Sequence, residues 1–135
     1  IVTYVCQFCD RNGIRAYEEE SRSGLLRHIY IRKGSATNEI MLCAVINGSK
    51  LPAEDKLVES LLDVNKNIKS ILININKKDT NVILGAECRL LWGSEYITDI
   101  LCSKKFRISP LSFYQVNRDQ AEKLYYKAKE YASLF

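Results

Sequence analysis

The chain has 135 residues, a length that predicts a single domain, or a piece of a longer protein, with its own hydrophobic core. Hydrophobic residues make up 47% and charged residues 27%, a balance that excludes intrinsic disorder. The longest apolar run, residues 40–46, is strand-sized, so no segment is long enough to span a membrane. Twenty basic and sixteen acidic residues give a net charge of +4, which permits a polyanionic partner without requiring one.

The first half of the chain predicts a helix followed by a pair of strands. Apolar residues recur at helical spacing over residues 1–12, and Gly13 is placed to end that helix. Residues 14–23 are polar and acidic and read as a connection. An alternating pattern over residues 25–32 and the continuous apolar run 40–46 predict a hairpin whose second strand is buried on both faces.

The second half predicts a helix, several strands and a closing helix. An apolar stripe with helical spacing runs from Pro52 to Leu62, and residues 68–75 alternate as a strand does. Asn117 is placed to cap the last helix, with Gln120 three residues later in a variant capping box. Three further short strands are predicted over residues 88–92, 96–102 and 106–108. The order predicts an α+β fold, with packed helices on a mainly antiparallel β-sheet.

The cysteines offer a metal-binding alternative that we do not favour. Five cysteines, an odd number with no signal peptide before them, predict free thiols and a cytoplasmic location. Cys6 and Cys9 form a CxxC pair, which can bind zinc, but His28 is the only histidine and no other ligands stand at motif spacing. Both cysteines fall on the helical face of Val2 and Val5, so we interpret them as core residues and predict no metal site.

Basic side chains offer candidate nucleic-acid contacts. His28 alternates with Tyr30 and Arg32 on the more polar side of its strand, where phosphate contact and base stacking suit RNA. The alternative is a solvated or hydrogen-bonded histidine. Lysines near strand ends fit two interpretations equally well, contact with phosphate groups and simple solubility. The candidate RNA contacts are Arg27, His28, Arg32, Lys77, Lys78, Lys104 and Lys105.

Motifs for catalysis are missing from the chain itself. No glycine-rich nucleotide loop occurs, no pair of carboxylates follows a strand, and no nucleophile stands in a recognisable context beside His28. The residues alone therefore predict no complete catalytic site.

Three stretches in a fixed order carry a resemblance to a known family. They are residues 24–32 (GLLRHIYIR), 80–85 (TNVILG) and 106–117 (FRISPLSFYQVN), supported by residues 91–97 (LWGSEYI). With them the chain resembles the RNA uracil-5-methyltransferase family, nearest to its bacterial 23S rRNA branch, RumA. The resemblance covers nearly the whole chain, and the phrase Ser-Phe-Tyr-Gln-Val-Asn is its most specific part.

The resemblance implies a parent protein of three parts. An oligonucleotide-binding barrel would come first, this segment would form the central domain, and a Rossmann-like S-adenosylmethionine domain would follow. Residues 1–108 would be the RNA-facing α+β domain, and residues 109–135 the linker and first helix leading into the methyltransferase domain, which is absent from this segment. The Cys that adds to C6 of uracil and the Glu that removes the C5 proton would lie beyond Phe135. We therefore expect no catalytic residue in this segment and no turnover by it alone.

Two site residues follow from the resemblance. Gln115 corresponds to a glutamine that contacts S-adenosylmethionine, and Phe113 to an aromatic residue near the extruded base. Members of this branch often carry an iron–sulfur cluster, but its ligands would lie upstream of Ile1. The implied partner is 23S rRNA, with no membrane and no protein partner. Two alternatives stay open: a non-catalytic scaffold or RNA-binding module with little part in the chemistry, and a free-standing module outside the family.

Overall fold

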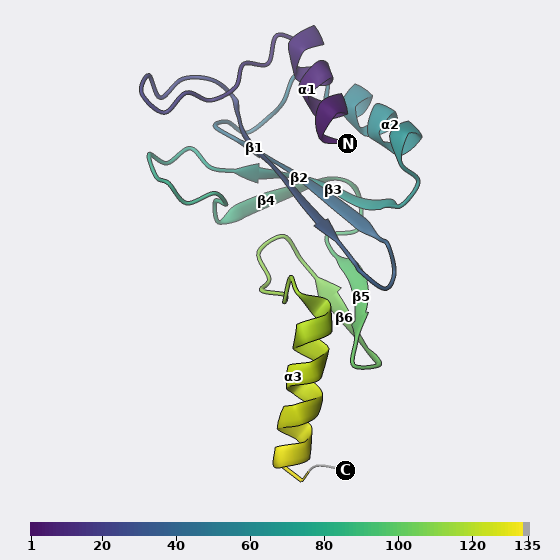
Figure 1. Ribbon diagram of the computed structural model, residues 1–135. Coiled ribbons are helices and arrows are strands. Elements are labelled where there is room, and N and C mark those ends of the chain that lie inside the picture. The colour runs from purple at the N-terminus through teal and green to yellow at the C-terminus, as the bar shows by residue number, and fades with distance from the viewer. Residues whose placement is uncertain (134–135) are drawn as a thin grey trace.

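A computed structural model describes residues 1–133 and shows three helices and six strands (Figure 1). In chain order they are α1 (Val2–Arg11), β1 (Leu26–Lys33), β2 (Ile40–Ile46), α2 (Glu54–Val64), β3 (Ile68–Ile75), β4 (Glu87–Gly93), β5 (Ile97–Leu101), β6 (Lys104–Ile108) and α3 (Arg118–Tyr131). The predicted α+β class is confirmed. The predicted bounds of β2 and β3 agree with the structure, and the other elements agree within a few residues.

The main sheet has four strands in the order β1-β2-β3-β4. β1 pairs antiparallel with β2, and β3 pairs antiparallel with β4, as the predicted hairpin and mainly antiparallel sheet require. β2 and β3 are parallel, because α2 carries the chain from the end of one strand back to the start of the next. The sheet is therefore mixed, with one parallel pair at its centre.

β2 is buried along its whole length because both faces of the sheet are covered. Leu42, Ala44 and Ile46 face α1 and α2 in a first core that also contains Leu57 and Leu61 of α2. The residues between them, Met41 and Cys43, face the opposite way into a smaller second core. The continuous apolar run in the sequence follows directly from this double coverage.

The second core lies under a second layer formed by the β5–β6 hairpin and the chain that follows it (Figure 1). Ile97 and Ile108 pair across that hairpin and pack against Met41 and Cys43. The predicted strand over residues 96–102 is one residue too long at each end. Cys102 and Ser103 both have positive φ, 50° and 60°, and form the two-residue turn itself.

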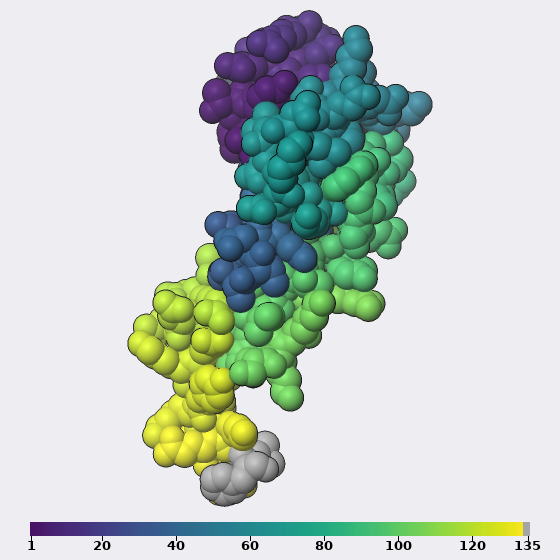
Figure 2. All heavy atoms as spheres, turned by 90° about the vertical axis from the view of Figure 1, so that its right-hand side faces the viewer, coloured from purple at the N-terminus to yellow at the C-terminus, as the bar shows by residue number. Residues whose placement is uncertain are grey.

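α3 extends away from the sheet at the end opposite α1 and α2, and gives the molecule an elongated outline (Figures 1 and 2). Its predicted cap is confirmed, because the backbone N–H of Gln120 donates to Asn117 Oδ1 at 3.2 Å. Ala121 is the buried residue of this helix, so most of its surface is exposed. The segment 109–135, predicted as a linker and helix leading into a following domain, includes residues 134–135, which lie outside the described residues; the division after residue 108 stays a prediction.

The interpretation of the CxxC pair as a pair of core residues is half wrong. Cys9 is buried in the first core beside Val5, whereas Cys6 is exposed and Val2 is 51% exposed. The reason is the narrow contact between α1 and the sheet, which buries only the stripe of Val5, Phe8 and Cys9. Within residues 1–133, no helix is both long and apolar enough to cross a membrane.

Candidate functional site

The site that the motifs predicted lies on residues 109–117, which we call the linker because they join β6 to α3. An open pocket of about 370 Å³ is formed where the linker meets the β5–β6 turn and the side of α3. Its wall is rich in aromatic rings and is lined by Leu101, Cys102, Lys104, Phe106, Phe113, Tyr114, Gln115 and Tyr125. We call it the linker pocket.

The structure brings Phe113 and Gln115 together at this pocket. The Phe113 ring is 84% exposed, so one face is free to stack against a planar ligand. Gln115 is half-buried, and its amide offers both a donor and an acceptor. Both residues also line a neighbouring hollow of about 400 Å³ against the edge of β1. A ligand on either side of the linker would therefore meet the same two side chains.

Hydrogen bonds hold the start of the linker and the helix that follows it. Arg32 of β1 donates from Nη1 to the carbonyl oxygen of Ser109 at 2.7 Å and to that of Ser112. At the other end, Glu122 of α3 accepts from the Cys102 backbone N–H at 2.9 Å and pairs with Arg118 at 3.0 Å. These bonds fix the start of the linker to β1, and they fix α3, which follows the linker, to the turn of the β5–β6 hairpin.

A third bond holds the middle of the linker. The Tyr114 hydroxyl donates to Asp99 Oδ2 at 2.9 Å, and the backbone N–H of Ala36 donates to Oδ1 at 2.8 Å. Burial alone would raise the pKa of Asp99, but the bonds from Ala36, Tyr114 and neighbouring backbone groups together hold the pKa below its ordinary value. Burial and the Asp99 carboxylate raise the pKa of Tyr114 to about 12. The pair is therefore a neutral phenol bonded to a carboxylate across the neutral range.

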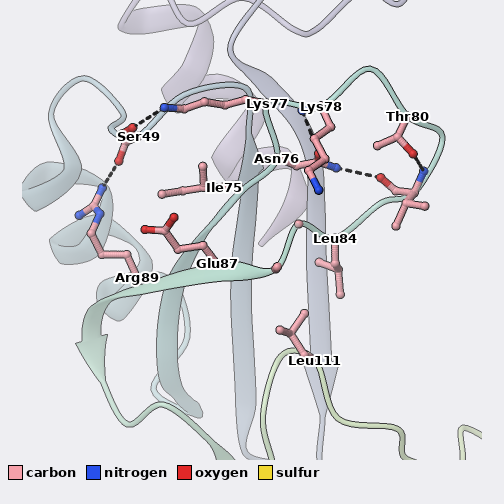
Figure 3. Close-up of a pocket in the computed structure, with 13 residues that line it drawn as sticks. Ser49, Ile75, Asn76, Lys77, Lys78, Thr80, Leu84, Glu87, Arg89 and Leu111 are labelled. Atoms are coloured by element: carbon pink, nitrogen blue, oxygen red, sulfur yellow. Dashed lines mark hydrogen bonds between the residues drawn. The ribbon is translucent and has the colours of Figure 1, made fainter.

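A second candidate surface lies around the β3–β4 loop, residues 76–86, beside an open cavity of about 820 Å³ (Figure 3). Lys77 and Lys78 are exposed at one rim, and Lys77 Nζ donates to Ser49 Oγ at 2.9 Å. Leu84 lines the cavity below them, and Leu111 of the linker approaches from the opposite side (Figure 3). The cavity thus connects the lysine-bearing loop with the linker.

The β3–β4 loop is held in one shape by buried polar side chains. The Asn76 amide donates to the carbonyl oxygens of Val82 and Ile83 at 2.8 and 3.2 Å. Asn74 exchanges two bonds with the backbone of Gly85, which lies so close to β3 that a Cβ there would be 1.9 Å from the Ile75 oxygen. Lys77 and Lys78 therefore project from a loop that is ordered before any ligand arrives.

The predicted RNA contacts separate into two groups. Arg27 donates to the carbonyl oxygens of Asn76, Lys78 and Thr80 at 2.7–3.0 Å, and Arg32 holds the linker. His28 is half-buried on the sheet face that the second layer partly covers. The four lysines are exposed, with Lys77 and Lys78 on the β3–β4 loop and Lys104 and Lys105 at the start of β6. The lysines are the more available group, and the structure uses both arginines to hold neighbouring loops.

The cysteines do not assemble a metal site. No group of three or more potential ligands gathers anywhere in the described part of the chain. Burial raises the pKa of Cys43 to about 12 and also raises that of Cys9, so both thiols stay protonated near neutral pH. These residues do not fit an iron–sulfur cluster, whose ligands are thiolates.

Sequence reasoning missed Asp99, Tyr114, Phe106 and Tyr125. Asp99 gave one signal that could have been used: it lies between Ile97 and Leu101 on the inward phase of a short strand, where a charged residue requires partners. Tyr114 stood inside the recognised motif but was attributed no role. Phe106 and Tyr125 are brought to the pocket by tertiary packing, which no local pattern reveals.

Comparisons with known proteins agree with this geometry. The chain is 42% identical over 134 residues to an uncharacterized RNA methyltransferase of Oceanobacillus iheyensis, which covers 99% of this chain and 29% of that protein. An uncharacterized RNA methyltransferase of Staphylococcus aureus is 45% identical over 122 residues, or 90% of this chain and 27% of that one. The chain thus spans less than a third of the length of these relatives. No protein-family model matches it.

A solved structure is similar over nearly the whole chain. The Pyrococcus abyssi tRNA (uracil-54, C5)-methyltransferase, determined in complex with S-adenosyl-L-homocysteine, matches with a TM-score of 0.77 and 28% identity, over 93% of this chain and 30% of that one. In fold and aligned sequence, the chain is thus similar to one part of proteins named as RNA methyltransferases. Within that class, these matches confirm the resemblance to the RNA uracil-5-methyltransferase family that the sequence motifs indicate. The 23S rRNA branch within it stays a prediction.

Proposed function

We propose that this chain is part of an RNA uracil-5-methyltransferase, which transfers a methyl group from S-adenosylmethionine to C5 of a uridine. In that reaction the bond from sulfur to the methyl carbon breaks as the bond to C5 forms, S-adenosylhomocysteine leaves, and C5 loses its proton. The observation that carries the proposal is the linker pocket, where the matched motif places Phe113 and Gln115 side by side against further aromatic rings.

Each of the two residues has one proposed role. The Gln115 amide fits the polar groups of S-adenosylmethionine, because it can donate and accept at once. The exposed face of Phe113 fits an extruded uracil ring by stacking. The linker pocket would supply only part of each binding site. We assign the nucleophilic Cys and the proton-accepting Glu to the part of the parent protein outside these residues, so this chain alone is expected to be inactive.

We propose that the exposed lysines contact the RNA backbone. Lys77 and Lys78 on the β3–β4 loop and Lys104 and Lys105 beside the linker pocket lie on either side of the linker. We propose 23S rRNA as the substrate and the cytoplasm as the location. The solved relative is named for a tRNA target, and a tRNA hairpin is therefore the competing substrate to test.

The experiment is a salt titration of RNA binding by the 135-residue chain. Two hairpins, one from 23S rRNA and one from the uridine-bearing arm of a tRNA, are titrated at 50 and 150 mM salt. Binding should weaken steeply with salt, and each lost phosphate contact should reduce the slope of log K against log salt by about 0.7–0.9. The double variants Lys77→Glu/Lys78→Glu and Lys104→Glu/Lys105→Glu should each show this reduction.

The control is Lys56→Glu/Lys66→Glu, which reverses two exposed lysines in or directly after α2, on the far side of the sheet from the linker (Figure 1). This variant changes the net charge by the same amount as the other two. Apart from the effect of that change, it should bind RNA like the native chain. A loss as large as that of the other two variants would mean that only net charge matters. Absence of binding at low salt would favour the scaffold alternative.

A second measurement tests the missing chemistry. The complete gene product should transfer the methyl group from S-adenosylmethionine to RNA, and the 135-residue chain should not. Methyl transfer by the purified 135-residue chain, in a preparation free of host enzymes, would contradict the assignment of the nucleophile to another part of the protein.

A further inference from the structure

The bond network around Asp99 links three segments that are distant in sequence. Asp99 is the third residue of β5 and is completely buried. Its carboxylate accepts from the Tyr114 hydroxyl in the linker and from the Ala36 backbone N–H in the turn between β1 and β2. A buried carboxylate is costly unless it is bonded, and here each oxygen has a partner. Among the described residues it is the one charged side chain that is fully buried.

The β1–β2 turn is attached to β5 by more than Asp99, so it provides a fixed reference point. Thr37 Oγ1 donates to the Thr98 carbonyl oxygen at 2.6 Å, and Glu39 accepts from both the N–H and the hydroxyl of Thr98. Gly34 comes so close that a Cβ there would lie 2.8 Å from the Thr98 oxygen. The main sheet therefore holds Asp99 in place through this turn.

Tyr114 connects Asp99 to the linker pocket. Its ring packs against the second core and lies 6.3 Å from the Phe106 ring, while the hydroxyl reaches Asp99. Phe113 and Gln115 are its two neighbours in the chain. With Tyr114 anchored inward, the exposed Phe113 ring and the Gln115 amide are held at the rim of the pocket.

We propose that Asp99 is a positioning residue: through the Tyr114 hydroxyl it fixes Phe113 and Gln115 in the geometry that receives the methyl donor and the target base. The consequence for catalysis rests on the proposed function. The ordering of Phe113 and Gln115 by Asp99 and Tyr114 does not. It concerns Asp99, which does not line the linker pocket, and the Tyr114 hydroxyl, which is bonded to Asp99. The network also fixes the position of the site relative to the main sheet, because β5 and the β1–β2 turn meet at Asp99.

The first test measures order in the 135-residue chain and needs no activity. Tyr114→Phe removes only the hydroxyl and leaves the ring packing and the Ala36 bond intact. NMR order parameters for the backbone amides of Phe113 and Gln115 should fall from near 0.85, typical of rigid backbone, toward 0.6. Tyr126→Phe is the matched control, since Tyr126 is 52% exposed on α3 and away from the linker pocket. Unchanged order parameters in Tyr114→Phe would overturn the proposal.

The second test measures kinetics in the complete gene product. Tyr114→Phe and Asp99→Asn should each raise KM for S-adenosylmethionine about ten-fold or more, as expected for losing a hydrogen bond to a charged group. The double variant should be no worse than the poorer single variant, because both changes break one connection. Additive losses, or an equal loss in Tyr126→Phe, would overturn the proposal.

The two tests separate the failure of this inference from that of the proposed function. An inactive native gene product would contradict the proposed methyltransferase while leaving the order parameters to decide the role of Asp99. An active native enzyme with an ordered linker in Tyr114→Phe would contradict the role of Asp99 alone. If Asp99→Asn does not fold, Tyr114→Phe carries both tests.

Discussion

The molecule has an upper layer, made of α1, α2 and the main sheet, and a lower layer, made of the β5–β6 hairpin, the linker and α3. The two layers are held together by different forces. In the upper layer, α1 and α2 cover the main sheet with the larger, wholly apolar core. In the lower layer, the β5–β6 hairpin and the linker bury a smaller core, and α3 buries little more than Ala121. The lower layer depends instead on polar attachments at Arg32, Asp99 and Glu122.

The difference explains where the candidate site lies. Apolar burial stabilises a layer but is non-directional, whereas a hydrogen bond fixes a distance and an angle. Phe113 and Gln115 lie in the layer that is held by directional bonds. A region that must present side chains to two ligands gains from this kind of attachment, because the positions of its residues are set more narrowly than packing alone would set them.

The largest expected effect comes from the same substitution made in each layer. Leu61→Ala in α2 removes a completely buried side chain and should lower the free energy of unfolding by about 2–5 kcal/mol. Leu124→Ala in α3 removes a side chain that is 61% exposed, so the change should be within about 0.5 kcal/mol. Urea denaturation of the 135-residue chain measures both. Equal losses would show that α3 packs far more closely than the structure describes.

The sequence predicted the upper layer better than the lower one, for a physical reason. β2 and β3 were delimited correctly because burial on both faces requires a long apolar run. The order of the strands was out of reach, since pairing is a property of the folded chain. The turn between β5 and β6 was predicted one residue late, at Ser103–Lys104, because neither Cys102 nor Ser103 is typical of a turn with two positive φ angles.

The sequence offered candidate site residues where a motif existed and missed the residues that only contacts in the folded chain bring to the pocket. Phe113 and Gln115 came from the resemblance; the structure brings both to the linker pocket, and their roles stay predictions. Arg27 and Arg32 show the limit of charge patterns, because a guanidinium that holds backbone carbonyls has the same sequence signature as one that awaits phosphate. Asp99 and Tyr114 are fifteen residues apart, and only the fold shows that they meet.

A smaller effect is expected from acid, and it compares one hydrogen-bonded carboxylate from each layer. The pKa of Asp99 in the lower layer and that of Glu54 beside Arg89 in the upper layer are both below their ordinary values. Groups of this kind stabilise the folded chain above their unfolded pKa, about 3.9 for Asp and 4.3 for Glu, and this stability is lost as pH falls through the lower folded values. The free energy of unfolding should therefore decrease as the pH is lowered below about 4.

Asp99→Asn and Glu54→Gln divide that loss between the layers. Each should be less stable than the native chain at pH 7 by about 1.5–3 kcal/mol, the usual contribution of a hydrogen bond to a charged group, and each should lose less on acidification. Urea denaturation at pH 7 and pH 3 gives both numbers. Asp63→Asn is the control, because Asp63 is exposed and only loosely paired with Lys66 at 3.5 Å. An acid response unchanged in Asp99→Asn would mean that Asp99 does not hold the lower layer.

The smallest expected effect concerns the start of α3, where the linker ends. Asn117→Ala removes the side chain that accepts from the Gln120 N–H and should cost about 1 kcal/mol of helix stability. Asn117→Asp keeps an accepting oxygen at the same place and is the matched control. Because α3 is attached to the rest of the molecule mainly through Arg118 and Glu122, the loss should appear as fraying of its first turn while the main sheet stays intact. Amide hydrogen exchange should accordingly accelerate over residues 118–122 in Asn117→Ala and remain native-like in the four-stranded sheet. Acceleration that spread to β2 and β3 would show that the two layers unfold as one unit, and that the polar attachments bind them as tightly as the apolar core binds the upper layer.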